Sequence, residues 1–515
     1  MKMRNVLEGL GAALLLLLPF IWPLVSPLNL TLYFHRLPVT NLVGGILVDL
    51  LGVAILATGF LVGLQYLPAT IQRIINALFA CFMLCCIVDF AIRMQSNLLI
   101  RAYWSGVRRQ SWIAIILLSF LLACFLPRIT QPAVRAVRLV IAAFAFSALW
   151  IIPQLLHLAL FRQSVQSAAS NHPSAFTSSG SDRRIVWILF DELSYDQTFD
   201  HPASDVKLPN FDRLRSESVS FSNLKPAGFY TDRIIPSLFL GRRIDQIRST
   251  VDGDLWYNNE HPPRWLAFDP NSTLFGLAQQ NGWSTGVDGW FNPYCRILAP
   301  VLSVCSWESG TLLTETYGAS EEKSALTNAV VVPITFFAIR ALHRQALGDV
   351  HLQNFRNVMA RTQALIENDQ VRFVFLHLNV PHPPGIYNRR RQMLRPGGTY
   401  LDNLVLADDT LGALLQEVYA TPSASQTTVI VSSDHSWRIP MYRHAEFWSD
   451  EEEHASGGRF DDRPVLLIHF PGQMSGNDIN AALPELLEHD IIADMLRGQI
   501  SNSENFAAFL SQHNH

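Results

Sequence analysis

Two stretches of this sequence place acidic and imidazole side chains directly after apolar runs, where such groups can do chemistry. In the first, the β-branched run Thr427–Val431 leads through two serines to Asp434 and His435. Such a run predicts a strand buried on both faces, and ligands of open α/β sheets bind beyond the carboxyl ends of strands. A carboxylate beside an imidazole can ligate a divalent metal there or position a proton. A capping aspartate next to a surface histidine would look the same, so this dipeptide leaves both interpretations open.

The second stretch is built in the same way. The apolar run from Arg184 to Phe190 ends in Asp191 and Glu192, so a second predicted strand delivers acidic side chains at its end. Two such strand ends can share one metal only if the strands lie close together in the sheet. The sequence alone does not determine that.

A third apolar run, Val371 to Val380, carries two histidines. His377 alternates within the run, which is equally typical of a histidine in the protein core. His382 stands between two prolines beyond the predicted strand end and is therefore held rigidly. We interpret His382 as a residue of the site.

Thr231 is a candidate nucleophile because it follows a loop containing Gly228 and begins a helical pattern. A hydroxyl at the start of a helix lies at the positive end of the helix dipole, and a nearby metal would lower its pKa. A helix-capping role would require the same residue at the same place, and the local pattern alone favours that role.

The elements that must position these residues follow from composition. The chain has 515 residues, of which 49% are hydrophobic and only 16% charged, which is too apolar for an ordinary soluble protein. The net charge of −4 gives no basic surface of the kind that nucleic-acid binding requires.

The apolar excess lies in the first third of the chain. Its runs are long enough to suggest about five transmembrane helices, although the fourth run is short. The first run could be a cleaved signal peptide, but it lacks a small-residue cleavage site and further runs follow, so we expect a retained anchor. The five runs are 7–28, 41–65, 70–92, 111–127 and 137–161.

Charge does not decide the orientation of these helices, because the positive residues flanking the two sides balance. The segment Asn97 to Arg109 mixes arginines with apolar residues and fits a helix lying in the membrane interface. Cys295 and Cys305 lie in the polar part of the chain, and a disulfide between them would indicate an oxidising compartment. With five spans, an exported carboxyl-terminal domain requires a cytoplasmic amino terminus.

The predicted domains are a membrane domain at 1–163, a flexible linker at 164–183 and a domain at 184–515. The linker is rich in serine and small residues. The last domain alternates apolar strands with helical patterns, which predicts an α/β fold with a mostly parallel central sheet between helices. A polar loop at 442–462 carries His454.

Taken in order, the stretches of the last domain resemble the alkaline phosphatase/sulfatase superfamily over nearly all of residues 184–515. Each motif is loose by itself, but the ordered set is fairly specific. The motifs are the strand ending in Asp191-Glu192, Pro-Asn-Phe-Asp-Arg-Leu with Phe-Ser-Asn, Thr231 with Ile-Pro-Ser-Leu-Phe-Leu-Gly, His377-Leu-Asn-Val-Pro-His-Pro, Ser-Asp434-His435, and Arg463-Pro-Val-Leu-Leu-Ile-His-Phe-Pro-Gly472.

The resemblance implies roles for individual residues. Asp191, Thr231, Asp434 and His435 would form the metal site, with Thr231 both ligand and nucleophile. His382 would contact the transferred group or its leaving oxygen. Further candidates for substrate contacts or a second metal are Glu192, His377 and His454.

One departure from the family pattern limits the chemistry. Sulfatases that use formylglycine carry Cys-x-Pro-Ser-Arg, but here Ile234 occupies the cysteine position and Leu238 the arginine position. A threonine nucleophile together with several membrane spans instead resembles lipoteichoic-acid synthases and phosphoethanolamine or phosphoglycerol transferases.

The resemblance therefore implies a membrane enzyme that uses one or two divalent ions (Mn²⁺, Mg²⁺ or Zn²⁺) to move a phospho-alcohol group from a phospholipid to a glycan or lipid of the cell envelope. It would reside in the plasma (inner) membrane, with its catalytic domain on the extracytoplasmic side. Hydrolysis of a phosphoric or sulfuric ester is the first alternative. A degenerate domain that only binds is the second.

Overall fold

The computed structural model describes most of the chain, and the helices and strands below are those of the described residues. The predicted linker lies outside this set except for residue 183. The described residues are 3–25, 39–93, 98–125, 127–160, 183–249, 255–259, 264–309, 323–337, 340–443, 445 and 447–513.

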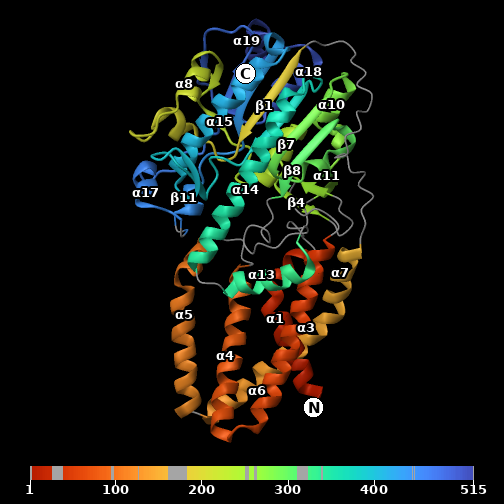
Figure 1. Cartoon of the computed structure of the whole chain (residues 1–515), viewed down its shortest axis with the longest axis vertical. Coiled ribbons are helices and arrows are strands. Elements are labelled where there is room, and N and C mark those ends of the chain that lie inside the picture. Colours follow the sequence, from red (N-terminus) through yellow and green to blue (C-terminus); the bar gives the residue numbers. More distant parts are fainter. Residues whose placement is uncertain are drawn as a thin grey trace. The chain divides into compact units, whose positions relative to one another are not determined.

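The chain forms two compact units, a helical unit and an α/β unit (Figure 1). The helical unit holds the amino-terminal helices and one helix from much later in the sequence, and the α/β unit holds nearly everything else. The helices of the first unit are α1 (Met3–Val25), α3 (Thr40–Gly63), α4 (Ala69–Arg93), α5 (Leu98–Phe125), α6 (Pro127–Phe144), α7 (Ala148–Leu160) and α13 (Ala325–Phe337).

Within the described part of the chain, four helical segments are long and apolar enough to cross a membrane: Met3–Trp22, Thr40–Tyr66, Ala69–Ile92 and Thr130–Leu160. The predicted fourth run lies on α5, where only the shorter segment Ser111–Leu122 is apolar. The segment expected to lie in the interface continues into that run as a single helix from Leu98.

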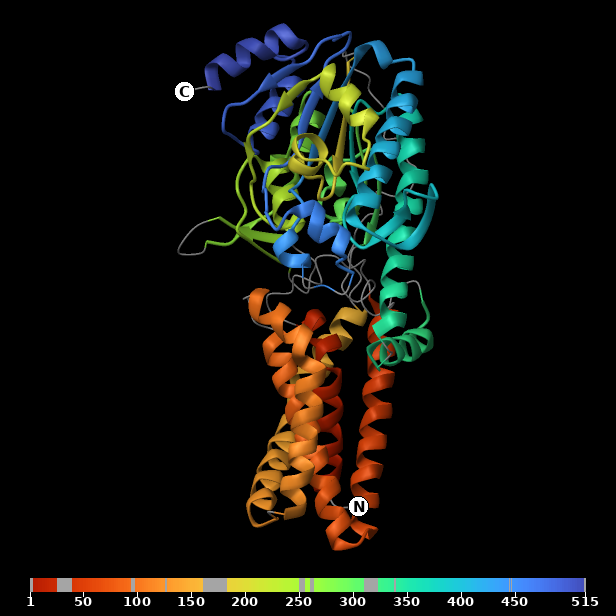
Figure 2. The same ribbon diagram turned by 90° about the vertical axis from the view of Figure 1, so that its left-hand side faces the viewer.

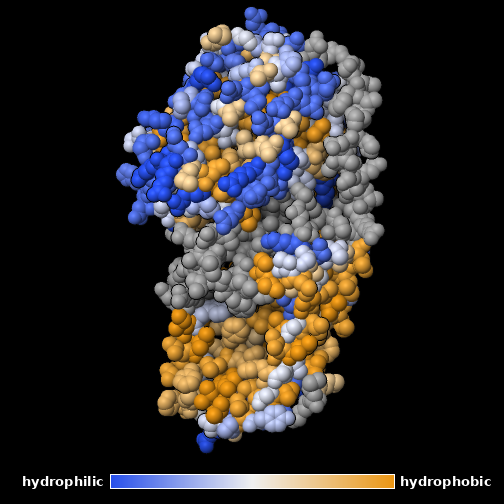
Figure 3. All heavy atoms as spheres, in the orientation of Figure 1, coloured by the Kyte–Doolittle hydropathy of each residue, from blue (hydrophilic) through white to orange (hydrophobic). Residues whose placement is uncertain are grey.

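Helix α1 is mostly buried, whereas its neighbours expose apolar side chains to the outside. Leu51, Ile55 and Leu56 of α3 are exposed, as are Leu117 and Leu118 of α5. Figure 3 shows this apolar surface over the helical unit and a mostly hydrophilic surface on the α/β unit. An apolar surface of this extent is typical of helices that anchor a protein in a membrane.

Helix α13 packs against α3 at a pair of glycines. A Cβ on Gly45 would lie 2.8 Å from the Cβ of Asn328 and 3.0 Å from the carbonyl oxygen of Ala325. A Cβ on Gly44 would lie 3.0 Å from that of Ala325. The two helices therefore approach closely only because α3 has no side chains at these positions.

The α/β unit is organised around one eight-stranded sheet. β13 is antiparallel to both of its neighbours, and the other neighbouring pairs in the sheet are parallel. In sheet order, the strands are β14 (Asn477–Ile479), β2 (Val219–Phe221), β13 (Leu466–His469), β12 (Thr427–Ser433), β1 (Arg184–Phe190), β9 (Phe373–Leu378), β7 (Thr285–Phe291) and β8 (Val304–Ser309).

Three small sheets lie outside the main one. They are β10 (Gly385–Asn388) with β11 (Met393–Gly398), β15 (Leu483–Pro484) with β3 (Leu224–Lys225), and β4 (Gln246–Ser249) with β5 (Leu255–Asn258) and β6 (Leu266–Ala267).

Helices cover both faces of the main sheet (Figures 1 and 2). One face carries α8 (Pro209–Ser216), α14 (Arg340–Glu367) and α15 (Tyr400–Ala420), and the other carries α9 (Thr231–Leu240), α10 (Leu274–Gln280) and α18 (Leu487–Arg497). The remaining helices are α11 (Tyr294–Ile297), α16 (Ile439–Tyr442), α17 (Asp450–Ser456) and α19 (Ser503–His513).

Alternate residues of the buried central strand β1 fill the two layers of the core. Val186, Ile188 and Phe190 join the large apolar cluster beneath α8, α14 and α15. On the opposite face, Trp187 packs edge-on against Phe375 of β9 with ring centroids 4.6 Å apart. A strand buried on both faces favours apolar or β-branched residues at successive positions, which is why residues 185–190 of β1 form a continuous apolar run and residues 427–431 of β12 are all β-branched. The predicted fold class is thereby confirmed.

The disulfide expected from the sequence is present. Cys295 of α11 is bonded to Cys305 of β8, and it joins two neighbouring elements at the edge of the sheet. The four other cysteines are free and lie in the helical unit.

Candidate active site

The register of three parallel strands creates the centre of the site. Phe190 of β1 pairs with Ser433 of β12 on one side and with Leu378 of β9 on the other. Asp191 and Asp434 are the next residues after Phe190 and Ser433, so adjacent strands deliver them side by side. The sequence predicted both strand ends, and the structure makes them neighbours.

The chain turns sharply after Asp191. Glu192 has a φ of +67°, in the left-handed region that residues with a side chain seldom adopt. Its amide donates to Asp434 Oδ1 at 3.1 Å, and its carbonyl accepts from the Tyr400 hydroxyl at 2.8 Å. These two hydrogen bonds stabilise the turn. As a result, the side chain of Asp191 faces His435, whereas the side chain of Glu192 faces Arg438.

Asp191, Asp434 and His435 form one buried cluster. His435 Nε2 lies 3.0 Å from Asp434 Oδ2 and 3.8 Å from Asp191 Oδ1. His435 Nδ1 is 3.0 Å from the carbonyl oxygen of Ser436, which can only accept, so Nδ1 carries a proton. In the neutral imidazole the lone pair of Nε2 therefore faces the two carboxylates.

Thr231 is the first residue of α9, and its hydroxyl faces this cluster. Its Oγ1 lies 3.1 Å from His435 Nε2, and only 3% of the residue is exposed. Tyr230 has extended backbone angles and ends the preceding loop, so the helix begins at the threonine itself. Ile234, which occupies the cysteine position of the formylglycine motif, is fully buried one turn further along α9.

The loop before Thr231 is held from the carboxyl-terminal part of the chain. Glu485 follows β15, the partner strand of β3, and its backbone amide donates to Lys225 at 2.8 Å. Its side chain accepts from the amide of Ala227, four residues before Thr231. The position of the threonine thus depends on a segment more than two hundred residues away in the sequence.

His377 lies within β9 and contacts both the core and the cluster. The Tyr294 hydroxyl lies 2.6 Å from Nδ1 of His377. The other ring nitrogen of His377, Nε2, lies 3.4 Å from Asp191 Oδ2. Gly289 of the neighbouring strand allows this approach, because a Cβ there would lie 2.6 Å from the Tyr294 ring. Burial lowers the pKa of His377 to about 4, so the imidazole is neutral near pH 7.

A second group adjoins the cluster on the side of Glu192. Arg438 donates from Nε to Glu192 Oε1, which also accepts from the Tyr442 hydroxyl at 2.8 Å. Arg438 Nη2 lies 3.2 Å from His382 Nε2. Since an arginine can only donate, Nε2 of His382 accepts and the proton of the neutral ring is on Nδ1. That Nδ1 is buried without a hydrogen-bond partner among the described residues.

Burial and neighbouring charges shift the pKa values of these groups in different directions. Burial, followed by the charge of Asp434, raises the pKa of Asp191 well above its ordinary value. Burial would also raise the pKa of Asp434, but the positive charge that His435 carries when protonated outweighs burial, and the pKa is lowered. For His382, burial and then the charge of Arg438 hold the pKa well below its usual range.

The structure also contains functional candidates that the sequence did not reveal. Arg438 and Tyr442 lie in the segment after β12, and neither an arginine nor a tyrosine there has a distinctive pattern. Asn292 lies just beyond the end of β7, and its Nδ2 is 3.4 Å from the Thr231 carbonyl. Asn292 gave a weaker signal than Asp191, because the strand that precedes it contains Thr285, Asp288 and two glycines and does not form an apolar run.

His454 is not brought into this site. It is exposed on α17 and belongs to neither group of side chains that could hold a metal among the described residues. The other seven candidate side chains, Asp191, Glu192, Thr231, His377, His382, Asp434 and His435, lie in or beside the cluster.

The side chains fit a divalent metal at Asp191, Asp434 and His435. Both carboxylate oxygens of Asp191 and Oδ2 of Asp434 are buried without a hydrogen-bond partner in the described structure. Unpaired buried carboxylate oxygens are costly, and a cation removes that cost. One ligand atom from each of the three residues lies within 4.8 Å of the others. Asp191, Glu192 and His382 form a second such group, but Arg438 already occupies Glu192 Oε1 and His382 Nε2.

The sulfatase family model matches residues 183–476, more than half of the chain. The chain belongs to the sulfatase family. Enzymes of this family are metal-dependent hydrolases or phosphotransferases of the alkaline phosphatase superfamily, which confirms the superfamily inferred from the sequence motifs. A search of curated protein sequences finds no match.

Solved structures of the same superfamily resemble the chain at low identity. The sulfatase PsFucS1 from Pseudoalteromonas sp. is 15% identical, with 62% of this chain and 68% of that one covered and a TM-score of 0.40. Phosphonate monoester hydrolase of Agrobacterium radiobacter is 14% identical (61% and 74% covered, TM-score 0.38). Lipoteichoic acid synthase LtaP from Listeria monocytogenes is 11% identical (62% and 74% covered, TM-score 0.38). TM-scores this low do not indicate which reaction this sulfatase-family chain catalyses.

Proposed function

We propose that this protein is a membrane-bound, metal-dependent enzyme that transfers a phospho-alcohol group through a covalent intermediate on Thr231. The observation that supports this most strongly is the position of the Thr231 hydroxyl. It lies 3.1 Å from His435 Nε2 at the amino end of α9, beside the buried carboxylates of Asp191 and Asp434.

Asp191, Asp434 and His435 would hold the metal, with the Thr231 oxygen as a further ligand. A bound divalent ion would lower the pKa of the Thr231 hydroxyl and attract the oxygens of the phosphoryl group. If all four ionise, Asp191, Glu192, Asp434 and Arg438 carry a net charge of −2. One divalent ion balances that charge, so we propose a single metal, with Arg438 as the second positive centre.

Thr231 attacks the phosphorus of a phosphodiester, and the bond from phosphorus to the leaving alcohol breaks. The positive end of the α9 dipole favours the negative charge that develops on the threonine oxygen. The attached group then passes to an acceptor hydroxyl, and the threonine oxygen leaves. His377 Nε2 lies near Oδ2 of Asp191, whereas His435 Nε2 lies near Oδ1, so the two imidazoles face different oxygens of this carboxylate.

His382 contacts the transferred group or its leaving oxygen as a neutral hydrogen-bond donor. Its Nε2 accepts from Arg438, which leaves the Nδ1 proton without a partner in the described structure. Because burial and Arg438 lower its pKa, His382 donates a hydrogen bond without carrying a full positive charge. The charge that stabilises phosphoryl oxygens on this side comes from Arg438.

The helical unit suggests the donor. Four apolar helical segments among the described residues suit a multi-pass anchor, which would keep the site at a lipid surface. We propose a phospholipid donor, a glycan or lipid acceptor, and a location in the plasma (inner) membrane. The Cys295–Cys305 disulfide favours placement of the α/β unit on the extracytoplasmic side.

Release of diacylglycerol from a detergent-dispersed phospholipid extract tests this function. The purified full chain is expected to release it in the presence of Mn²⁺, Mg²⁺ or Zn²⁺, and Thr231→Ala should reduce the rate at least ~10³-fold without loss of bound metal. Asp434→Asn should lose both metal and turnover. Near wild-type release by Thr231→Ala would contradict the assignment.

Hydrolysis of a phosphate or sulfate ester is the second candidate function, because formation of the same intermediate followed by attack of water needs no acceptor. Turnover of p-nitrophenyl phosphate or sulfate without an acceptor, and without diacylglycerol release, would favour it. Absence of metal together with absence of any turnover would instead indicate a degenerate binding domain.

A further inference from the structure

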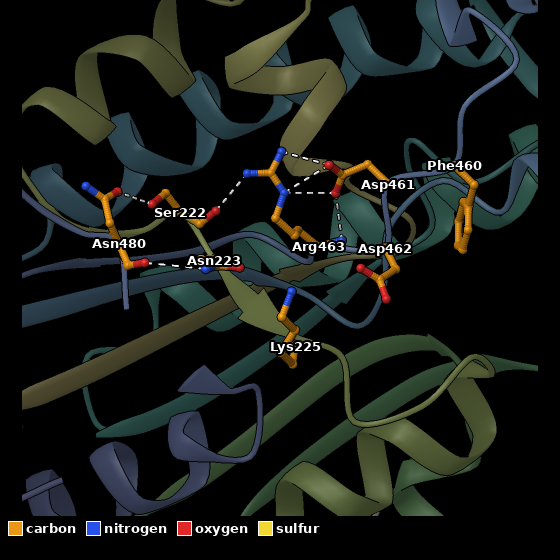
Figure 4. Close-up of a pocket in the computed structure, with 8 residues that line it drawn as sticks. All are labelled: Ser222, Asn223, Lys225, Phe460, Asp461, Asp462, Arg463 and Asn480. Atoms are coloured by element: carbon orange, nitrogen blue, oxygen red, sulfur yellow. Dashed lines mark hydrogen bonds and ion pairs between the residues drawn. The ribbon is translucent and has the colours of Figure 1, made fainter. Parts of the chain in front are cut away.

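A pocket of about 540 Å³ opens on the α/β unit between residues 222–225 and 460–463 (Figure 4). One wall leads toward the proposed nucleophile, since Asn223 and Lys225 come just before the loop that ends at Thr231. The other wall lies beside the end of β1, where the Tyr195 amide donates to the Arg463 carbonyl at 3.3 Å. Tyr195 is four residues beyond Asp191, so both walls adjoin the active-site edge of the sheet.

A continuous series of aromatic rings connects this pocket to Thr231. Phe460, at one end of the pocket, is 40% exposed. Its ring centroid lies 6.3 Å from that of Phe229, which in turn lies 5.1 Å from Tyr230. Tyr230 immediately precedes Thr231. A ligand resting on Phe460 would thus lie two ring contacts away from the residue next to the threonine.

The floor of the pocket is fixed by Arg463. Its guanidinium donates to the Ser222 carbonyl at 2.8 Å, to Asp200 at 2.7 Å and to Asp461 at 2.8 Å. Those bonds neutralise the arginine and hold the two walls together. Arg463 is therefore a rigid support and does not offer a free positive charge to an anion.

The remaining polar groups of the pocket combine donors with acceptors. Asn480 uses its carbonyl and side-chain oxygens to accept from Asn223 and Ser222, which leaves its amide nitrogen as a donor. Lys225 offers a second donor, and Asp462 and the side-chain oxygen of Asn223 offer acceptors. No hydrogen bond of these four groups occurs within the described structure.

This mixture of groups favours a ligand that carries both donors and acceptors. Hydroxyl groups both donate and accept, so they satisfy all four groups at once. An inorganic anion would meet the carboxylate of Asp462, and a simple cation would meet the ammonium of Lys225. The exposed face of Phe460 adds an apolar platform of the size of a sugar ring, and ligand sites generally combine such a surface with a few placed polar groups.

We propose that this pocket is a saccharide subsite, which holds a sugar of the acceptor while a hydroxyl of that acceptor reaches the group on Thr231. The inference rests on the proposed group transfer and adds the class of acceptor. It makes the residues of the pocket determinants of acceptor specificity, without a part in the attack on the donor.

Binding of disaccharides to the full chain tests the proposal. The probes are maltose, cellobiose and N,N′-diacetylchitobiose, observed by saturation-transfer NMR in a detergent without a sugar head group. At least one should bind to the wild type and to Thr231→Ala. Phe460→Ala and Asn480→Ala should weaken that binding at least ~10-fold. Tyr419→Ala, which removes an aromatic residue 44% exposed on α15, is the matched control and should bind as the wild type does.

A second readout separates this inference from the proposed function. In a single turnover without acceptor, Phe460→Ala should release diacylglycerol at a rate within about twofold of the wild type, but on addition of the disaccharide it should transfer the group from Thr231 at least ~10-fold more slowly. Absence of disaccharide binding by the wild type, or equal binding by both pocket variants, would overturn the inference whatever the turnover. Pocket-dependent binding without any turnover in the wild type would overturn the proposed function and leave a saccharide-binding site.

Discussion

Asp191, Glu192 and Asp434 are all fully buried within a short distance of one another, and the three carboxylates differ in the partners that compensate their charge. Glu192 is paired with Arg438, and Asp434 accepts from two backbone amides. Among the described residues, Asp191 has ion-pair partners only in two histidines, at 3.4 and 3.8 Å. It is the residue whose charge most requires a metal.

Glu488 is a further buried carboxylate whose charge has no such partner. Burial raises its pKa to about 8, and one of its oxygens has no hydrogen-bond partner in the described structure. Between about pH 4.5 and pH 8, the Glu488 carboxyl is therefore protonated in the folded chain. In the unfolded chain its pKa has the ordinary value of 4.5, so it has lost its proton over this pH range. Its contribution to stability is present below about pH 4.5 and is lost as the pH rises through about 8.

Glu488→Gln should remove this dependence, because an amide resembles the protonated acid and does not titrate. Each unit of pKa shift corresponds to about 1.4 kcal/mol, so we expect a gain of at least ~1 kcal/mol in the free energy of unfolding at pH 8.5 and little gain at pH 5. Thermal unfolding of the full chain in detergent at pH 5 and at pH 8.5 measures this change in stability. Glu504→Gln, at an exposed position, is the control. An equal change of Tm at pH 5 and pH 8.5 would contradict the account.

At the residue scale, the sequence predicted the groups that directly follow apolar strands. Asp191, Asp434 and His435 share this signal, and all three lie in one cluster. Arg438 and Tyr442 were missed because they lie just before and at the end of the short helix α16, whose four residues are too few to show a periodicity that marks a residue as buried or exposed. Their roles depend on Glu192, whose orientation depends in turn on a left-handed turn that the sequence does not specify for a glutamate.

At the element scale, the strands were predictable but their order was not. The apolar runs at 184–190, 371–380 and 427–431 correspond to β1, β9 and β12. β1 lies between the other two although about two hundred residues separate it from each in sequence. That order depends on which faces the helices α8, α14 and α15 cover, and single runs of apolar residues carry no information about it.

Helix α13 shows that an apolar segment far along the sequence can pack with the amino-terminal helices. It begins at Ala325, ends at Phe337 and belongs to the helical unit. Gly44 and Gly45 of α3 form the surface that receives it.

The contact between α3 and α13 can be tested with two glycines of the same helix. A Cβ at Gly45 would meet Asn328 and Ala325, whereas a Cβ at Gly52 has no atom within 4 Å. We expect Gly45→Ala to destabilise the helical unit by about 1–3 kcal/mol and Gly52→Ala to be neutral or slightly stabilising. Thermal unfolding in detergent gives both values. Equal values for the two variants would contradict the packing of α13 on α3.

At the scale of the whole molecule, the apolar helices and the disulfide favour opposite environments for the two units. The helical unit has an apolar surface and free cysteines, and the α/β unit has a polar surface and a disulfide. Since disulfides persist in oxidising compartments, the α/β unit should lie outside the cytoplasm.

Protease treatment of sealed, right-side-out membrane vesicles tests this orientation. We expect degradation of the α/β unit without detergent, while apolar helical segments remain protected. Alkylation under denaturing conditions should modify four cysteines before reduction and all six after it. Protection of the α/β unit until detergent is added would contradict the orientation, and modification of all six cysteines without reduction would contradict the disulfide.

The central claim is that Thr231 carries the transferred group, and a mass spectrum of the peptide containing Thr231 tests it most directly. The full chain is incubated with divalent metal and a phospholipid extract, then quenched in acid and digested. We predict an added mass equal to a phospho-alcohol on Thr231 and none on the matching peptide of Thr231→Ala. An unmodified Thr231 in a chain that binds metal and releases diacylglycerol, or an adduct on another residue, would contradict the account.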